Sequence, residues 1–281
     1  NRFEKLKKFL IKDYIAEKKL FLEKQKQKKI NNNFSTKVRK QYEEHPYPRW
    51  VSVSLNKDDT ILICDMIKIL KLKIYNESIK KITSPKVLIA GCGTGRQSIE
   101  AASLYKNGDI LAIDISRKSL SYAKRKSLEL GYENIKYMQA DILDLGEINE
   151  KFDVIECTGV LHHMADPVVG WRVLSNLLKV GGLMKIGLYS KYAREDISKI
   201  RNEIKAQKIN YDDFSMKNYR SNIIQSKKYL KSIINSDDFY CISSFRDLLF
   251  HIHESHYTLS EISNCLNDLN LRFSGFEGCT K

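Results

Sequence analysis

One short segment, residues 87–95 with the sequence VLIAGCGTG, constrains the fold of this chain more than any other. The apolar run 86–90 passes straight into three glycines that alternate with other residues. A strand that turns at once into a helix through such glycines lets a ligand approach the backbone where a Cβ atom would collide. The segment therefore predicts a ligand-binding turn, with a tight turn that binds nothing as the alternative.

The spacing of these glycines narrows the choice of ligand. Enzymes that bind NAD carry G-x-G-x-x-G, in which the third glycine allows close packing of the helix. Here Gly91, Gly93 and Gly95 are spaced G-x-G-x-G, so that helix contact is not expected. An NAD-dependent oxidoreductase stays an alternative, because it shares the same type of sheet.

Further apolar runs follow the glycines at intervals and predict an α/β fold. They cover residues 110–113, 135–138, 152–155 and 183–188, with a sixth run at 271–276. Strands that alternate with helices of about 10–15 residues favour a parallel sheet covered on both faces. We therefore expect a Rossmann-like sheet of six strands.

Capping residues mark the ends of the intervening helices. Ser116 is placed to cap a helix over 117–130, and Gly131 follows its end. Asp166-Pro167 opens the next helix, and we expect Gly181-Gly182 to close it. Thr258 and Glu261 have the spacing of a capping box.

Two regions stand outside the alternating pattern. Residues 1–57 form an expected extension, in which an amphipathic helix over 3–29 precedes a proline-rich stretch. Residues 58–281 form the main domain, which we expect to open with a helix from Asp59 to about Lys80. A helical insertion at about 191–257 interrupts this domain after the fifth strand, where a lid over a substrate would be placed.

Composition limits the partners. The net charge of +14 suggests nucleic acid, but lysine outnumbers arginine by about three to one and the charge concentrates in the first 40 residues. We therefore do not expect a nucleic-acid partner. The chain lacks an apolar run long enough to span a membrane and shows no signal peptide at its start. Six cysteines without CxxC spacing favour free thiols in a reducing cytoplasm.

Two aspartates end successive strands. Asp114 follows the second strand and can accept hydrogen bonds from the hydroxyls of a ribose. Asp141 follows the third, where it can accept from an adenine amino group while Ile142 packs on the ring; a capping role for Asp141 is the alternative. Carboxyl ends of parallel strands meet in one crevice, so these groups should lie together.

The order GCGTG, AID, QAD and FDVIECTGVLHHM between about Lys86 and Ser190 resembles class I methyltransferases that use S-adenosylmethionine (SAM). The resemblance implies that the glycines line the methionine and ribose part of SAM, that Asp114 and Asp141 hold ribose and adenine, and that residues 157–159 lie beside the sulfonium. The full set expected to bind SAM is Gly91, Cys92, Gly93, Thr94, Gly95, Gln97, Asp114, Ile115, Asp141, Ile142, Cys157, Thr158, Gly159, Tyr47 and Arg49.

The last two residues of that set belong to the stretch 42–50, YEEHPYPRW. It resembles a segment that precedes the methyltransferase domain in bacterial proteins with tetratricopeptide repeats. The resemblance implies that residues 1–30 could be the tail of a repeat array and that Tyr47 or Arg49 covers the site. A proline-rich linker that packs Trp50 on the core is the alternative.

Methyl transfer requires alignment of donor and acceptor and, for some acceptors, removal of a proton. The candidates at the strand ends are Glu156, His162, His163 and Tyr189, with one histidine as general base. The alternative is that the two histidines only shape the pocket.

A second group of histidines, His251, His253 and His256, follows in the insertion. On a helix only His253 and His256 would share a face, and the HExxH spacing is absent. We therefore expect no metal and assign these side chains to the substrate.

The sequence thus predicts a SAM-dependent methyltransferase that acts on a small-molecule substrate. A protein acceptor recruited through an upstream repeat array is the alternative, as is a SAM-binding module without catalysis. The acceptor and the oligomeric state are not encoded in any motif.

Overall fold

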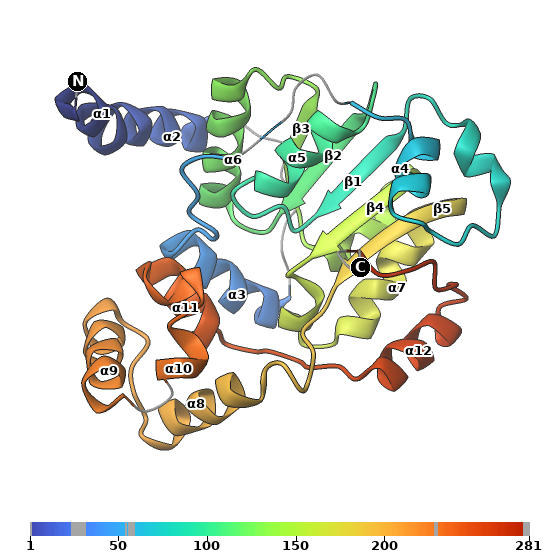
Figure 1. Ribbon diagram of the computed structural model, residues 1–281. Helices are drawn as coiled ribbons and strands as arrows, with labels where there is room; N and C mark the ends of the chain where they lie inside the picture. Colours follow the sequence, from blue (N-terminus) through green and yellow to red (C-terminus); the bar gives the residue numbers. More distant parts are fainter. Residues whose placement is uncertain (1, 24–31, 54, 56–59, 228–229, 278–281) are drawn as a thin grey trace.

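A computed structural model describes residues 2–23, 32–53, 55, 60–227 and 230–277. Its centre is a five-stranded parallel sheet with the order β3-β2-β1-β4-β5 (Figure 1). This confirms the predicted parallel α/β sheet. The strands are β1 (Lys86–Ala90), β2 (Asp109–Asp114), β3 (Ile135–Gln139), β4 (Phe152–Thr158) and β5 (Leu178–Gly187).

Alternate residues of β1 enter two hydrophobic cores, one on each face of the sheet. Val87 and Ile89 pack with α4, α5 and α6, whereas Leu88 and Ala90 pack with α7 and α12. Since successive side chains of a strand point to opposite faces, the apolar run 86–90 reads as a strand buried on both sides. The helices are α4 (Ile63–Ile69), α5 (Arg96–Leu104), α6 (Arg117–Leu130), α7 (Pro167–Leu177) and α12 (Leu259–Asp268).

The predicted helix starts are confirmed. Ser116 accepts from the backbone N–H of Ser119, Asp166 accepts from Val168 and Val169, and Thr258 forms the capping box with Glu261. The predicted end at Gly131 is confirmed by its φ of 78°. Short 3-10 segments complete this part of the chain: η2 (Glu77–Lys81), η3 (Ile142–Glu147) and η4 (Leu161–His163).

The expected role of Gly181 and Gly182 is wrong. Helix α7 already ends at Leu177, and both glycines lie in β5. A Cβ atom at Gly182 would stand 2.9 Å from the carbonyl oxygen of Asp153, and one at Gly181 would stand 2.6 Å from the amide of Asn76. The glycines therefore allow β5 to pass close to its neighbours, beside the register shift between Phe152 and Val154.

The expected sixth strand is also wrong, since no strand forms over 271–276 in the described chain. Leu271 packs in the core, but Phe273 and Phe276 are 48% and 55% exposed and pack on each other. The segment runs instead beside residues 73–75, where Lys73 N–H donates to the carbonyl of Ser274 at 2.8 Å. One such bond does not make a ladder.

The helix expected from Asp59 to Lys80 is much shorter. Its first residue lies outside the described part of the chain, and α4 spans only Ile63–Ile69. Lys71 adopts a left-handed φ of 51°, and Asn76 then caps η2 by accepting from Ser78 N–H. Asparagine favours such a break because its side chain bonds its own backbone two residues on.

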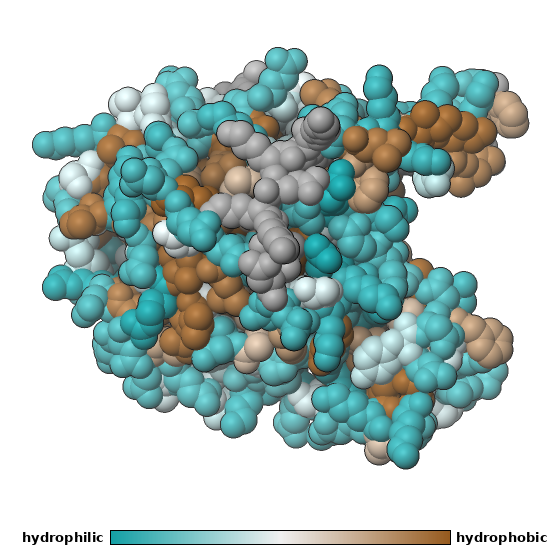
Figure 2. Space-filling view, turned by 180° about the vertical axis from the view of Figure 1, so that it is seen from behind, coloured by the Kyte–Doolittle hydropathy of each residue, from teal (hydrophilic) through white to brown (hydrophobic). Residues whose placement is uncertain are grey.

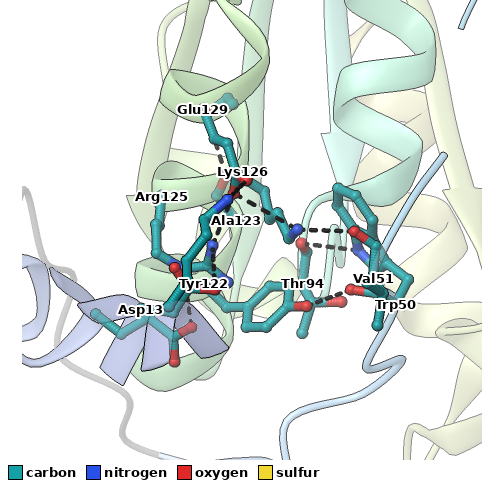
Figure 3. Close-up of polar contacts among 12 residues, drawn as sticks. Asp13, Trp50, Val51, Thr94, Tyr122, Ala123, Arg125, Lys126 and Glu129 are labelled. Atoms are coloured by element: carbon teal, nitrogen blue, oxygen red, sulfur yellow. Dashed lines mark hydrogen bonds and ion pairs between the residues drawn. The ribbon is translucent and has the colours of Figure 1, made fainter. Parts of the chain in front are cut away.

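The N-terminal helices α1 (Arg2–Lys7), η1 (Lys8–Lys12) and α2 (Asp13–Leu22) project from the sheet domain (Figure 1). Their expected apolar face is not covered, because Phe3, Leu6 and Leu10 are exposed. Figure 2 shows hydrophobic surface on this projecting arm at the upper right. Residues 24–29 of the expected helix lie outside the described part of the chain. Polar contacts attach α2 to α6 instead. Arg125 Nε lies 2.9 Å from Glu17, and Asp13 lies 3.4 Å from the same guanidinium (Figure 3).

The insertion forms a helical layer with its own core between β5 and α12. Its elements are α8 (Glu195–Ala206), α9 (Asp213–Ser226), α10 (Leu230–Ile233), η5 (Asp237–Phe239) and α11 (Ile242–Phe250). The chain returns along Tyr189 and Lys191, which both bond the backbone of Tyr257. Helix α3 (Asn33–Glu44) lies against α11 (Figure 1), where Arg246 pairs with Glu44 at 2.8 Å. Among the residues shown, no helix is long and apolar enough to cross a membrane.

Candidate active site

A cavity of about 410 Å³ opens at the carboxyl ends of β1, β2 and β4. The turn after β1 lines one side of it, and helix α3, Tyr189 and α11 line the other. Open α/β sheets bind ligands at this edge, since the strand ends and the loops that follow them converge there. Eleven of the residues predicted to bind a cofactor line the cavity: Gly91, Cys92, Gly93, Gln97, Asp114, Ile115, Asp141, Ile142, Thr158, Gly159 and Tyr47.

The backbone angles of the three glycines, and the protein atoms packed against them, already require residues without a side chain. Their φ values are 78°, 52° and 86°, which disfavours any residue with a side chain. A Cβ atom would lie 2.3 Å from Val160 at Gly91, 2.6 Å from the Tyr47 carbonyl at Gly93 and 2.5 Å from Ala123 at Gly95. The turn is thus packed against the segment after β4, α6 and the proline-rich stretch, while Gly91 and Gly93 also line the cavity.

Asp114 is buried at the cavity wall. Its carboxylate accepts from Gly93 N–H and from Ser116 N–H, each at 2.8 Å. Burial raises the pKa of Asp114 to about 6, although these backbone bonds act in the opposite direction. Each oxygen keeps a second lone pair, so the carboxylate can also accept from a ligand hydroxyl.

Asp141 caps η3 and keeps one free acceptor. One oxygen accepts from Leu143 N–H at 3.0 Å. The other oxygen is buried and has no hydrogen-bond partner. Since buried acceptors are almost always paired, this oxygen is available to accept a hydrogen bond from a ligand. Ile142 and Ile115 lie in the same wall.

Three further predicted cofactor residues, Thr94, Gly95 and Cys157, do not line the cavity. Thr94 is buried and donates to the carbonyl of Pro48, and Gly95 packs on α6. Cys157 is fully buried, and burial raises the pKa of its thiol to about 12. Gln97, by contrast, lines the cavity and donates to Glu156 at 2.9 Å.

Hydrogen bonds join the proline-rich stretch to the glycine turn and to α6 (Figure 3). Trp50 Nε1 donates to the carbonyl of Thr94 at 3.2 Å, Tyr122 donates to the carbonyl of Trp50, and Lys126 donates to the carbonyl of Val51 at 2.8 Å. Trp50 is part of the core, as in the alternative interpretation of this stretch.

Tyr47 and Arg49, the two residues of this stretch predicted to bind the cofactor, lie in different surroundings. Tyr47 reaches the cavity and donates to Asp238 at 3.1 Å. Arg49 is half exposed, lies over the ring of Tyr122 and is 4.0 Å from Glu17. The structure thus places Tyr47 beside the strand ends but keeps Arg49 outside the cavity.

Of the four catalytic candidates, His163 and Tyr189 line the cavity. His163 is buried, its Nδ1 lies 2.8 Å from the carbonyl oxygen of His253, and burial lowers its pKa to about 4. The carbonyl can only accept, so Nδ1 carries the proton and Nε2 keeps a lone pair at neutral pH.

His162 and Glu156 do not line the cavity. His162 stacks on Tyr189 with ring centroids 3.8 Å apart, and burial lowers its pKa to about 2. Glu156 accepts from Gln97 and from Tyr105, each at 2.9 Å. Both side chains therefore support residues that reach the cavity rather than reaching it themselves.

The second group of histidines is not helical, contrary to expectation. Helix α11 ends at Phe250, and His251 is extended with ψ of 142°. The carbonyl of His251 accepts from Arg201 at 2.6 Å, and Ser255 N–H donates to the carbonyl of His162 at 2.7 Å. These bonds satisfy the backbone outside a helix.

None of these three histidines lines the cavity. His251 stacks on His163, His253 Nε2 bonds Ser255 at 3.0 Å, and His256 pairs with Glu254 at 2.6 Å. Glu254 also binds Arg194 through two hydrogen bonds.

Sequence reasoning missed the far wall of the cavity. Phe34, Val38 and Tyr42 of α3 line it, together with Asp247 of α11. The spacing of 34, 38 and 42 is that of one helical face, so this wall could have been found from the apolar pattern. Asp247 lies in an ordinary amphipathic helix and gives no such signal.

Comparison with known proteins gives a family. The family model described as a methyltransferase domain matches residues 81–238 of the 281 in the chain, more than half. An uncharacterised protein of Synechococcus sp. is 28% identical over 205 residues, covering 68% of this chain and 48% of that protein.

A ubiquinone biosynthesis O-methyltransferase of Aliivibrio fischeri is 33% identical over 115 residues, covering 40% of this chain and 47% of the relative. The chain therefore spans about half the length of the curated relatives it matches.

Among solved structures, PKMT2 from Rickettsia typhi matches with a TM-score of 0.58 at 19% identity, covering 80% of this chain and 44% of that one. Its complex with AdoHcy matches with a TM-score of 0.52 at 21% identity, covering 72% and 40%. At these identities the similarity is one of fold, and it confirms the Rossmann-like architecture predicted from the sequence.

Proposed function

Since the chain belongs to the methyltransferase domain family, we propose that it transfers the methyl group of SAM to a small-molecule acceptor. SAM supplies an activated methyl group on a sulfonium. The protein has to hold this donor at the strand ends and to bring one nucleophilic atom of the acceptor in line with it.

The residues at the strand ends fit such a donor. The unpartnered oxygen of Asp141 suits the adenine amino group, and the remaining lone pairs of Asp114 suit the ribose hydroxyls. We assign the methionine end to the side formed by Gly91, Gln97 and Thr158, which line the same cavity.

One observation carries the proposal of a small acceptor. The cavity does not stop at the donor residues but continues to α3 and α11, so that donor and acceptor would share one cavity. The acceptor end is lined by Phe34, Tyr42, Tyr47 and Tyr189. Mostly apolar, aromatic walls with a few polar groups are typical of small-molecule sites.

His163 is the candidate that meets the reacting atom. It lines the cavity with a neutral ring whose Nε2 can accept a proton from the acceptor. We propose that Tyr189 lies beside the acceptor, that His162 holds Tyr189 by stacking, and that Glu156 orients Gln97.

Two alternatives differ in what occupies the acceptor end. A protein acceptor, recruited through a repeat array upstream of α1, would insert one side chain there. A SAM-binding module without catalysis would leave it without a nucleophile.

The free thiols at positions 64, 92, 157, 241 and 265 fit a reducing compartment such as the cytoplasm.

Methyl transfer from isotopically labelled SAM tests the proposal. The chain would be incubated with panels of phenols, carboxylic acids, amines and thiols, and separately with peptides and intact proteins. We expect label in at least one extractable small molecule, and less label with the Asp114→Asn variant at a SAM concentration that does not saturate it. Label confined to protein would favour the protein acceptor, and label in neither would contradict catalysis.

A further inference from the structure

Three side chains that are distant in sequence meet beside the acceptor end of the cavity. His163 ends η4, Asp247 lies in α11 and His251 follows α11, and one ligand atom from each lies within 4.8 Å of the others. All three are buried, with exposures of 4%, 4% and 1%. Within the described parts of the chain, no other group has this composition and spacing.

The two histidines are held in the same orientation. The Nδ1 atoms of His163 and His251 lie 2.8 Å and 2.7 Å from one acceptor, the carbonyl oxygen of His253. Their rings stack with centroids 3.7 Å apart and an angle of 24°. Because both Nδ1 atoms face that carbonyl, both Nε2 atoms point away from it, on the same side.

The Nε2 atom of His251 is buried and has no hydrogen-bond partner. A buried polar atom without a partner costs about 1–3 kcal/mol, so native proteins rarely leave one. The carbonyl of His253 favours a proton on Nδ1 and a lone pair on Nε2, whereas the N–H of His253, 3.1 Å from the same Nδ1, favours the other tautomer. Binding of a cation would select the form with the lone pair on Nε2. A cation would satisfy all three groups.

We propose that Nε2 of His163, Nε2 of His251 and the carboxylate of Asp247 bind one divalent transition ion, for example Zn²⁺. Two imidazoles and a carboxylate are a common ligand set for such ions. Ligand atoms about 2.0–2.2 Å from a tetrahedral ion stand roughly 3.4 Å apart, and the ion lies in the plane of each imidazole that binds it. Closing the site therefore requires inward movements of about an ångström and a turn of one ring out of the present stack.

The surroundings support these ligands. A histidine that binds a metal usually donates its other N–H to a carbonyl or carboxylate, and the carbonyl of His253 is such an acceptor beside Nδ1 of both rings. Tyr42 donates to Asp247 at 2.8 Å and fixes the orientation of the carboxylate. Glu254 pairs with Arg194 and lies 3.8 Å from Arg201, which offsets positive charge near the ion.

The position of the ion suggests its use, and this step rests on the proposed function. Three protein ligands leave a position open, and His163 and Asp247 both line the cavity. An acceptor hydroxyl bound there would release its proton to water more readily, so that His163 would act as a metal ligand in place of its proposed role as general base. Its oxygen would then attack the methyl carbon, the C–S bond would break with its electron pair on sulfur, and a methyl ether and S-adenosylhomocysteine would form.

Metal binding is tested without any acceptor. The full chain, free of affinity tag and stripped of metal, would be titrated with Zn²⁺ in competition with a chromogenic chelator. We expect one ion per chain. Asp247→Asn and His251→Gln should each weaken binding at least about 10-fold, the lower end of the loss seen for supporting residues alone. His45→Gln, a change outside the cluster, should leave it unaltered.

Two further readouts keep the result decisive. The visible spectrum with Co²⁺ in the wild-type chain should indicate nitrogen and oxygen ligands; a thiolate charge-transfer band would contradict the site. Less than one Zn²⁺ ion bound per wild-type chain, or variants that bind Zn²⁺ as tightly as the wild-type chain, would also overturn it. S-adenosylhomocysteine titrated into the same samples reports the donor site separately, so loss of one function is distinguishable from loss of the other.

Discussion

The phenol oxygen of Tyr42 lies 2.8 Å from the carboxylate of Asp247, and this bond joins α3 to α11 across the acceptor end of the cavity. The two residues are separated by 205 positions in sequence. The contact therefore couples the N-terminal extension to the insertion, and it makes both regions part of one site.

Removing that bond should loosen the wall without affecting the donor. Tyr42→Phe keeps the ring on His251 but leaves a buried carboxylate oxygen with one donor fewer. We expect a loss of about 1–3 kcal/mol in the free energy of unfolding. The affinity for S-adenosylhomocysteine, measured by calorimetry, should be unchanged; a large loss would mean that α3 helps to hold the donor.

Asp114 should contribute strongly to donor binding. Asp114→Asn retains one acceptor oxygen but removes the charge and one of the two paired oxygens, so the affinity for S-adenosylhomocysteine should fall by about 1–3 kcal/mol, roughly 5- to 150-fold. Asp109→Asn is the matched control, since Asp109 begins the same strand and pairs with Lys136 on the surface. Equal affinity in both variants would refute the ribose assignment.

The same residue should make binding depend on pH. Burial raises the pKa of Asp114 to about 6, with Glu43 adding to the rise and the N–H groups of Gly93, Ser116 and Ile115 opposing it. Below that pH the carboxyl is protonated and loses acceptor capacity. The affinity for S-adenosylhomocysteine should thus weaken as pH falls from about 7 to about 5, whereas the Asp114→Asn profile should be flatter. Identical profiles would assign the titration to another group.

Gly95 tests whether the glycine turn is fixed by packing. Gly95→Ala imposes a φ of 86° on a side chain and places its Cβ 2.5 Å from Ala123, which should cost about 1–3 kcal/mol or more in thermal unfolding. Gly131→Ala has a similar φ of 78° but meets nothing within 4 Å. The difference between the two variants measures the contact with α6, and no difference would contradict it.

His163 and His162 should behave differently despite their adjacency. His163 presents a lone pair to the cavity, so His163→Gln should lower kcat about 10²- to 10⁴-fold with the best acceptor found, at unchanged donor affinity. His162→Gln loses the stack on Tyr189 and the edge contact with His163 but no group that lines the cavity, so we expect a smaller change in kcat and a lower Tm. The opposite order would exchange their roles.

Much of the fold could be predicted because its signals are local. The run 86–90 and the caps at Ser116, Asp166 and Thr258 depend on neighbouring residues alone, and the structure confirms them. The strand predicted over residues 271–276 is wrong, because apolar alternation does not show whether a neighbouring strand is available for pairing. The helix considered for residues 251–256 does not form, because the backbone there bonds to Arg201 and His162, which are distant in sequence.

The candidate site likewise contains some residues that could be predicted from the sequence and others that could not. Asp114 and Asp141 could be found because they end strands of a parallel sheet, whose carboxyl ends meet. Asp247 could not, because it reaches the cavity only when the insertion folds against α3. The meeting of His163 and His251 also depends on the return of the chain along β5, which no local pattern encodes.

Calorimetric titration of the chain with S-adenosylhomocysteine, SAM and NADH tests the central claim most directly. The account predicts binding of both sulfur ligands at one site per chain and no binding of NADH. Binding of NADH alone, or of none of the three, would contradict a donor site formed by the glycine turn, Asp114 and Asp141.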